Sequence, residues 1–153
     1  MTDSRPIRGA ALVVDDEPNM CLILEKTLHL EGFRVSAFTR PREALEALAR
    51  VQPDVVLTDL LMPETDGMEV MRAVKRLDPT IPTIIVTAHG SIEGAVEAMR
   101  QGAFDYVTKP FLTQELLVTV ERAIEVRRLH EQRASVNALW NRTQAPAEAV
   151  GVS

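Results

Sequence analysis

Five polar residues stand at the ends of short apolar segments, where the strands of a parallel sheet would finish. Asp15 and Asp16 follow the segment AALVV, and Asp59 closes VVLTD. Thr87 closes TIIVT, and Lys109 follows DYVT. Open parallel sheets bind ligands at the carboxyl ends of their strands. We therefore expect three carboxylates, a hydroxyl and an amine to meet at one edge of a sheet.

Each of these residues has an ordinary structural explanation when it is considered alone. An acidic pair is often a solvated turn, and Asp59 or Thr87 would serve equally well to cap a following helix. Lys109 alone would be surface charge. Their joint occurrence after separate apolar segments favours a functional site.

The combination predicts phosphoryl transfer assisted by Mg²⁺. Three carboxylates held close together repel one another and need a cation, and hard oxygen ligands select Mg²⁺ over softer metals. An aspartate can act as a nucleophile toward phosphorus and form an acyl phosphate. The Lys109 ammonium would neutralise charge on the phosphoryl oxygens, and the Thr87 hydroxyl would donate a hydrogen bond to them.

Alternating segments predict the fold that positions these residues. Short apolar runs rich in β-branched residues are typical of buried parallel strands, and the segments between them carry apolar residues at helical spacing. We expect strands over 10–14, 34–38, 55–57, 83–86 and 105–108, and helices over 18–30, 41–50, 67–77, 91–101 and from 113 onward. This order predicts an α/β fold with a five-stranded, doubly wound parallel sheet. The strand ending near Phe38 has no polar terminal residue and should lie outside the site.

The composition narrows the class of protein. The 153 residues suffice for one domain, and 46% hydrophobic and 25% charged residues are ordinary for a globular protein. A net charge of -5 gives no basic footprint, so we expect no direct nucleic-acid binding by this chain. The single cysteine, Cys21, excludes an internal disulfide, and no segment is apolar enough for a secretory signal or a membrane span. These features predict a cytoplasmic location and no membrane contact.

Four motifs together resemble the receiver domain of the bacterial response regulators. They are LVVDDEP (12–18), VVLTDLLMPETDG (55–67), IIVTAHG (84–90) and GAFDYVTKPF (102–111), in the order and spacing of that family. The resemblance covers roughly residues 8–128. It implies a flavodoxin-like fold and a phosphorylation-dependent switch of a two-component system. Such a domain is not a classical enzyme, because it catalyses only its own phosphorylation and slow dephosphorylation.

The resemblance also implies a role for each site residue. Asp59 would accept the phosphoryl group from a phosphohistidine on a sensor histidine kinase. Asp15 and Asp16 would hold Mg²⁺ together with Asp59 and the backbone carbonyl of Leu61. Lys109 would pair with the phosphoryl group.

Two further residues would report phosphorylation to the rest of the domain. Thr87 would bind a phosphoryl oxygen and move, and Tyr106 matches the aromatic residue that turns inward as the Thr87 loop shifts. The alternative is that Tyr106 is an ordinary half-buried tyrosine of a strand, with no switching role. The bond between Lys109 and Pro110 would be cis, as it is in the family. Two variable positions, Leu61 and His89, would flank the path of the hydrolytic water and govern the lifetime of the acyl phosphate.

The segment TAHGSIEGAVEAMRQGAFDYVTKPF resembles receivers of the NtrC class, which control σ54-dependent transcription. In such proteins an output ATPase and a DNA-binding domain follow the receiver. The present sequence contains no GxxxxGK[ST] phosphate loop and no helix-turn-helix pattern. It is either a piece of a longer protein or a free-standing receiver, and the sequence leaves both possibilities open.

The final helix is predicted to continue past the domain as a linker over 129–142, before a disordered tail over 143–153. Apolar residues in and before the linker fall at coiled-coil spacing: Val126, Leu129, Val136 and Trp140. Arg122 and Arg133 interrupt this seam. The two interpretations that remain are a solvated linker helix and a homodimer made through the fourth helix, the fifth strand and the fifth helix.

Two other classes of protein share parts of this pattern. A hydrolase of the haloacid dehalogenase type needs a second aspartate two residues after the nucleophile, where this chain has Leu61, and Asp66 comes too late. A nucleotide or flavin binder would carry GxGxxG after the first strand, and the acidic loop at Asp15 and Asp16 would repel phosphate unless a metal intervened.

Overall fold

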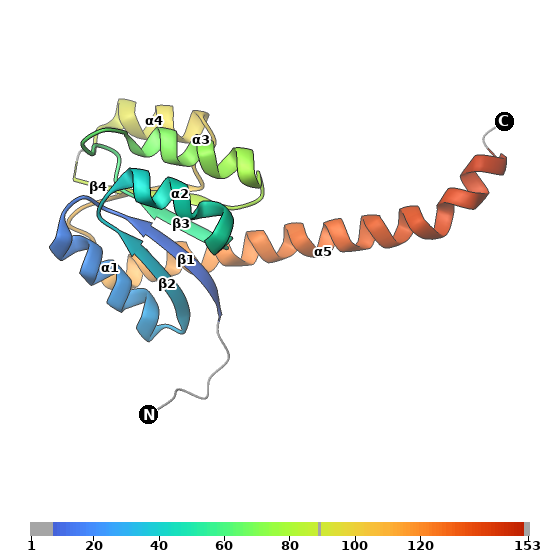
Figure 1. Cartoon of the computed structure of the whole chain (residues 1–153), viewed down its shortest axis with the longest axis horizontal. Coiled ribbons are helices and arrows are strands. Elements are labelled where there is room, and N and C mark those ends of the chain that lie inside the picture. Colours follow the sequence, from blue (N-terminus) through green and yellow to red (C-terminus); the bar gives the residue numbers. More distant parts are fainter. Residues whose placement is uncertain (1–7, 89, 152–153) are drawn as a thin grey trace.

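Strands and helices alternate along the whole chain in the computed structural model, which describes residues 8–88 and 90–151, with side chains up to residue 141 (Figure 1). The strands are β1 (Gly9–Val14), β2 (Phe33–Phe38), β3 (Val55–Thr58), β4 (Thr83–Thr87) and β5 (Asp105–Thr108). The helices are α1 (Pro18–Leu30), α2 (Pro41–Val51), α3 (Gly67–Leu77), α4 (Ile92–Arg100) and α5 (Thr113–Gly151).

The five strands form one parallel sheet in the order β2-β1-β3-β4-β5, which confirms the predicted doubly wound fold. The chain winds outward from β1 in both directions, so the strand order reverses between β1 and β3. Val14 pairs with Thr58, and the residues that follow them, Asp15 and Asp59, therefore lie next to each other. β2 lies at one edge of the sheet.

Helices cover both faces of the sheet (Figure 1). On one face, α1 and α5 pack against β1, β3 and β4, with Leu24, Leu28, Leu116 and Val120 fully or almost fully buried. The other face is covered by α2, α3 and α4, which bury aliphatic residues such as Val70 against the sheet. This three-layer arrangement leaves the two ends of the strands as the only edges where polar side chains from several strands can meet.

The helix starts follow from local sequence. Pro18 and Pro41 open α1 and α2, where the missing amide hydrogen of proline removes no helical hydrogen bond. Asp66 caps α3 by accepting a hydrogen bond from the Glu69 amide. Ser91 caps α4 in the same way.

α5 is much longer than the domain needs. One side of the helix is buried as far as Ile124, and most residues beyond it with described side chains are exposed as the helix leaves the domain (Figure 1). The backbone of α5 is helical as far as Gly151. The side chains from residue 142 on lie outside the described part, so the disorder of the tail stays a prediction. Among the described residues, no helix has the length and hydropathy to cross a membrane.

Candidate functional site

Two buried carboxylates occupy the carboxyl edge of the sheet at the point where the strand order reverses. Asp15 is fully buried and Asp59 is 7% exposed. The Asp15 amide donates to the carbonyl of Phe38, and the Asp59 amide donates to that of Val14. These bonds continue the ladders of the neighbouring strands, so the backbone of each aspartate is held by the sheet itself.

Lys109 bridges the two carboxylates. Its Nζ lies 2.7 Å from Oδ2 of Asp15 and 3.3 Å from Oδ2 of Asp59, and its side chain is 8% exposed. At the end of β5 the Lys109 amide donates to the carbonyl of Thr87, and the bond from Lys109 to Pro110 is cis, as expected. Lys109, which is 94 positions from Asp15 and 50 from Asp59 in sequence, thus supplies the only cation at 4 Å or less from either carboxylate among the described residues.

A third carboxylate joins this pair. One oxygen each from Asp15, Asp16 and Asp59 lies within 4.8 Å of the others, and Asp16 is partly exposed to solvent. One lysine therefore faces three acids, and the site carries an excess of negative charge. Hard oxygen donors around such an excess are the ligand type that Mg²⁺ prefers.

The pKa values of Asp15 and Lys109 are both raised, for different reasons. Burial raises the pKa of Asp15, and the hydrogen bonds from Lys109 and from the Glu17 amide offset only part of that effect. Burial alone would lower the pKa of Lys109, but its hydrogen bond and ion pair with Asp15, together with the charge of Asp59, raise it. The lysine therefore stays charged at neutral pH, and the carboxylates are short of positive charge.

Backbone groups fix the loop after Asp59. The Leu60 amide donates to Oδ1 of Asp59 at 2.7 Å, and the Gly67 amide donates to the carbonyl of Leu60 at 2.7 Å. Gly67 is the first residue of α3, and a Cβ there would lie far inside 3.0 Å of the Asp59 carbonyl oxygen. The helix can seat against the Asp59 backbone only because this residue has no side chain. Leu61, in the same loop, is 52% exposed.

Thr87 and Tyr106 lie on the adjacent strands. Thr87 ends β4, is fully buried, and pairs with Thr108, the residue before Lys109. Tyr106 is half-buried and packs in the cluster between α3, α4 and the sheet. Burial raises its pKa, and a Cβ on Gly94 of α4 would lie 3.4 Å from its hydroxyl. The Tyr106 ring therefore points toward the start of α4.

The structure brings the predicted residues together to different degrees. Asp15, Asp59 and Lys109 are in direct contact, and Asp16 completes the acidic cluster. Thr87 and Tyr106 belong to the neighbouring strands, and His89 lies outside the described residues. Sequence reasoning assigned Gly67 only to the start of a helix and missed its close approach to Asp59. The available signal was a glycine directly after a capping aspartate, eight positions beyond the proposed nucleophile.

Comparison with known proteins identifies the class to which this fold and site belong. Residues 11–121 match the model of the response regulator receiver domain, and the chain belongs to this family. It is 41% identical over 144 residues to the DNA-binding transcriptional regulator NtrC of Proteus hauseri, covering 94% of this chain and 30% of that protein.

Solved structures agree with this membership. A receiver domain protein from Clostridium thermocellum superimposes with a TM-score of 0.74 and 34% identity, covering 78% of this chain and 97% of that one. The beryllofluoride-activated NtrC4 receiver domain dimer gives a TM-score of 0.73 and 32% identity, with coverages of 77% and 98%. The present chain spans about 30% of the length of the curated relatives that it matches.

Proposed function

We propose that this receiver is a switch of a two-component system, in which Asp59 accepts a phosphoryl group from a phosphohistidine on a sensor histidine kinase. A carboxylate oxygen of Asp59 attacks phosphorus, the bond from phosphorus to the imidazole nitrogen breaks, and the imidazole keeps the electron pair and takes up a proton from solvent. The observation that carries this proposal is the buried Lys109 ammonium held between Asp15 and Asp59, beside the third carboxylate of Asp16.

The donor set fits Mg²⁺, because it consists of hard oxygens with too little positive charge around them. Asp15, Asp16, Asp59 and the backbone carbonyl of Leu61 would hold the ion. When bound, Mg²⁺ supplies positive charge that offsets the charge of the phosphoryl oxygens.

The chain's own residues supply the rest of the proposed reaction. Lys109 turns from the unmodified carboxylates to a phosphoryl oxygen, so its charge is used both before and after transfer. The Leu60 amide already donates to Oδ1 of Asp59, which leaves Oδ2 as the oxygen that faces Lys109 and becomes the nucleophile. The Thr87 hydroxyl donates to a phosphoryl oxygen. The domain turns over one phosphoryl group per chain and is no classical enzyme.

Phosphorylation would shift an equilibrium between two conformations of the segment from Thr87 to Tyr106. Tyr106 packs against the start of α4, so a movement of the β4–α4 loop changes what its ring contacts. α4 also presents an apolar surface, with Ile92 85%, Val96 50% and Met99 46% exposed. A rearrangement of α4 would therefore alter a surface suited to binding a partner.

That partner is proposed to be a second receiver, and the output is σ54-dependent transcription through an ATPase and a DNA-binding domain outside this chain. The similarity to NtrC and the dimer of the NtrC4 receiver support this proposal. The dimer would use α4, β5 and α5, and α5 adds exposed apolar residues at coiled-coil spacing: Val126, Leu129, Val136 and Trp140. The alternative of a solvated linker helix predicts a monomer.

Sedimentation velocity separates these two states. A double substitution of Leu129→Glu and Val136→Glu places charge on the seam, and Ser135→Glu places one charge on another exposed face of the same helix. The dimer proposal expects the double variant to be monomeric under conditions in which wild type and S135E form dimers. Identical sedimentation of all three proteins would show that α5 takes no part in an interface.

Intact-mass measurement tests the phosphorylation itself. Wild type incubated with acetyl phosphate and Mg²⁺ is expected to gain one phosphoryl group of about 80 Da, and to gain none in EDTA. Asp59→Asn should gain nothing, whereas the matched control Asp66→Asn, in the same loop, should be modified like wild type. Modification of D59N to the wild-type extent would contradict the assignment of Asp59.

A further inference from the structure

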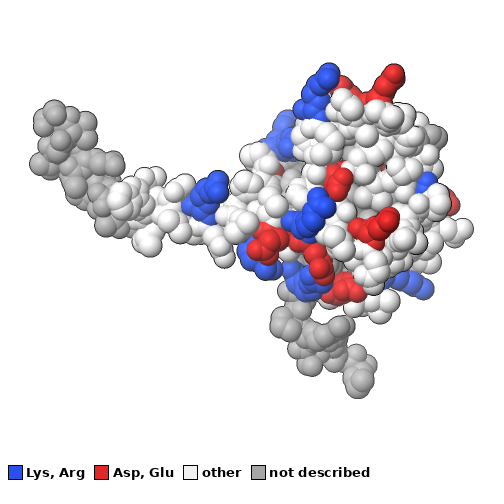
Figure 2. Space-filling view, turned by 180° about the vertical axis from the view of Figure 1, so that it is seen from behind, with Lys and Arg blue, Asp and Glu red and all other residues white. Residues whose placement is uncertain are grey.

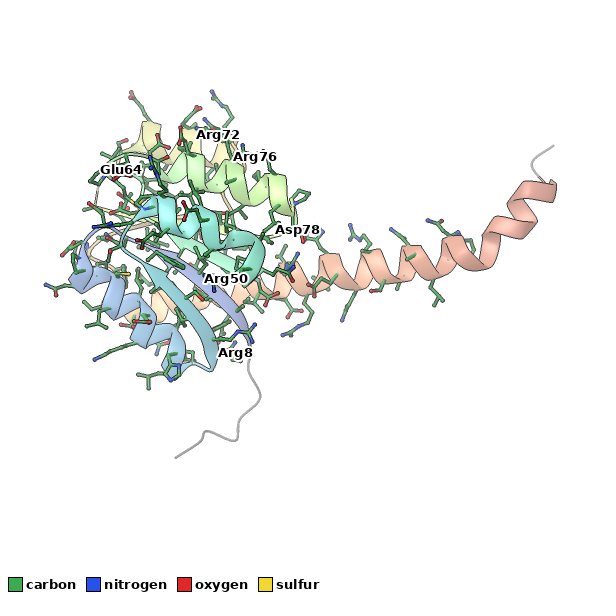
Figure 3. The ribbon with its side chains drawn as sticks, viewed as in Figure 1. Arg8, Arg50, Glu64, Arg72, Arg76 and Asp78 are labelled. Atoms are coloured by element: carbon green, nitrogen blue, oxygen red, sulfur yellow. The ribbon has the colours of Figure 1, made fainter. Side chains whose placement is uncertain are left out.

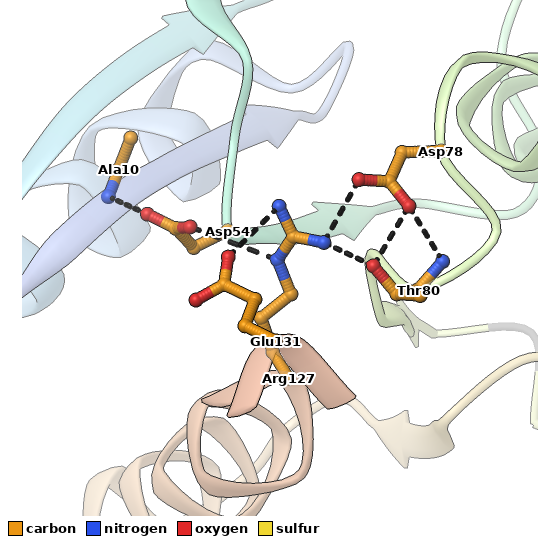
Figure 4. Close-up of polar contacts among 6 residues, drawn as sticks. All are labelled: Ala10, Asp54, Asp78, Thr80, Arg127 and Glu131. Atoms are coloured by element: carbon orange, nitrogen blue, oxygen red, sulfur yellow. Dashed lines mark hydrogen bonds and ion pairs between the residues drawn. The ribbon is translucent and has the colours of Figure 1, made fainter. Parts of the chain in front are cut away.

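The opposite edge of the sheet holds a second charged cluster, centred on Arg127 of α5 (Figure 4). Its Nη1 lies 2.9 Å from Oδ2 of Asp78 and also donates to the hydroxyl of Thr80. Nε lies 3.7 Å from Oδ1 of Asp54, and Nη2 lies 3.4 Å from Glu131, one turn further along the helix. The side chain is only 13% exposed, which is unusual for a residue on a helix leaving its domain.

The partners of Arg127 belong to several elements. Asp54 immediately precedes β3, and its Oδ2 accepts a hydrogen bond from the Ala10 amide of β1 at 2.9 Å. Asp78 ends α3 and also accepts from the amide and hydroxyl of Thr80, in the turn that leads to β4. One guanidinium therefore joins α5 to the amino-terminal ends of β1 and β3 and to the α3–β4 turn.

This cluster lies at the place where α5 loses its contacts with the sheet. Ile124, one turn before Arg127, is the last buried apolar residue of the helix within its described part. In Figure 3, Asp78 lies at the end of α3 near the emerging helix, and Glu64, in the loop after Asp59, lies at the other end of α3. Figure 2 shows acidic and basic side chains close together where α5 leaves the domain.

The neighbouring cations have other partners. Arg8 pairs with Glu31 and with Glu121 of α5, at 3.6 and 3.1 Å, and Arg128 pairs with Glu125 at 3.5 Å. These pairs are more exposed than Arg127, and exposed ion pairs contribute little to stability. Arg127 is thus the residue whose loss would free the helix at this point.

We propose that Arg127 is a clamp that fixes α5 to the amino-terminal edge of the sheet, so that the first exposed turn of the helix, up to Glu131, moves with the sheet as one rigid unit. The planar guanidinium suits this role, because Nη1 donates to Asp78 and Thr80 while Nε lies at ion-pair distance from Asp54. A lysine in its place would keep the positive charge but lose the planar set of N–H donors. The clamp stands on these contacts alone, so its failure would leave the proposed phosphorylation of Asp59 untouched.

Hydrogen exchange of the whole chain, followed by mass spectrometry, tests the clamp. Arg127→Gln removes the cation, and Arg128→Gln is the matched control, an adjacent exposed arginine with a single ion pair. We expect amides over residues 124–135 to exchange about ten to a hundred times faster in R127Q, because charge-assisted hydrogen bonds hold this turn. R128Q should exchange like wild type over the same peptides, and peptides of β1 and β4 should keep their protection in both variants.

Two further variants keep the test decisive if R127Q fails to fold. Asp78→Asn weakens one contact without changing α5, and Arg127→Lys keeps the charge; both should speed exchange over 124–135, by less than R127Q. Wild-type exchange over 124–135 in D78N and R127K would overturn the clamp. So would equal acceleration in R127Q and R128Q, or a uniform rise across the sheet in R127Q, which would show a general contribution to stability instead of a local attachment.

Discussion

A methyl group at Gly67 should slow phosphorylation without replacing any residue that takes part in the chemistry. Gly67 opens α3, and a Cβ there would lie far inside 3.0 Å of the Asp59 carbonyl oxygen and 3.1 Å from the Leu60 Cα. These are backbone atoms, which cannot rotate away as a side chain would. Gly67→Ala must therefore push the start of α3 away from the backbone that carries Asp59.

The size of the effect follows from the required displacement. Ordinary contacts begin near 3.4 Å, so the backbone must move by about 1 Å. Forcing extra volume into packed structure costs about 1–3 kcal/mol of unfolding free energy. Misplacing reacting groups by 1 Å can cost about a hundredfold in rate, so we expect phosphorylation of G67A to slow by about tenfold or more.

The assay is the rate of mass gain with acetyl phosphate and Mg²⁺, with folding checked by chemical denaturation. Gly94→Ala is the matched control, because a Cβ at Gly94 would meet only the ends of the Ser91 and Tyr106 side chains, at 2.9 and 3.4 Å. Alanine inside a helix is favoured over glycine, so G94A should be at least as stable as wild type and be phosphorylated at a similar rate. A folded G67A protein that is phosphorylated at the wild-type rate would refute the reasoning.

Three further changes test other parts of the structure. Thr83 is 1% exposed, and its hydroxyl has no hydrogen-bond partner among the described residues; Thr83→Val should raise the unfolding free energy by about 1 kcal/mol in urea denaturation, and a loss would show that the hydroxyl is satisfied. Lys109→Met leaves Asp15 and Asp59 without their buried cation, so the unfolding free energy in EDTA should fall by about 3 kcal/mol at neutral pH; unchanged stability would contradict the ion pairing. Burial acts to raise the pKa of Asp78, but hydrogen bonds from Thr80 and Arg127 outweigh burial, so the pKa is lowered. The ionised Asp78 therefore stabilises the fold above the unfolded-state pKa, near 4, and this stabilisation is lost as pH falls through the folded-state pKa. The stability difference between wild type and Asp78→Asn should therefore shrink from about pH 6 to about pH 3, and a difference that is constant across this range would contradict the lowered pKa.

The sequence predicts those parts of the site that depend on strand ends. Asp15, Asp59 and Lys109 each follow a short apolar segment, and parallel strands necessarily bring their carboxyl ends to one edge. The same logic placed the strand ending at Phe38 outside the site. These features are predictable because the hydrophobic pattern determines the sheet, and the sheet determines which residues meet.

Other features depend on packing that no local pattern encodes. Arg127 lies on a helix rich in charged residues, and nothing in its sequence neighbours separates it from the exposed Arg128 beside it. Its partners Asp54 and Asp78 come from turns distant in sequence, so the cluster exists only once the layers have packed. The close approach of Gly67 to Asp59 likewise depends on how α3 is seated against the sheet.

Whether Asp59 carries the phosphoryl group can be tested on the acyl phosphate itself. Borohydride reduces an acyl phosphate to the alcohol, which converts a phosphorylated aspartate to homoserine, and peptide mass spectrometry then locates the modified residue. After incubation with acetyl phosphate and Mg²⁺, we expect homoserine at position 59 only, and none when EDTA is present. Modification at Asp15, Asp16 or Asp66 with Asp59 unchanged would show that Asp59 is not the phosphorylated residue.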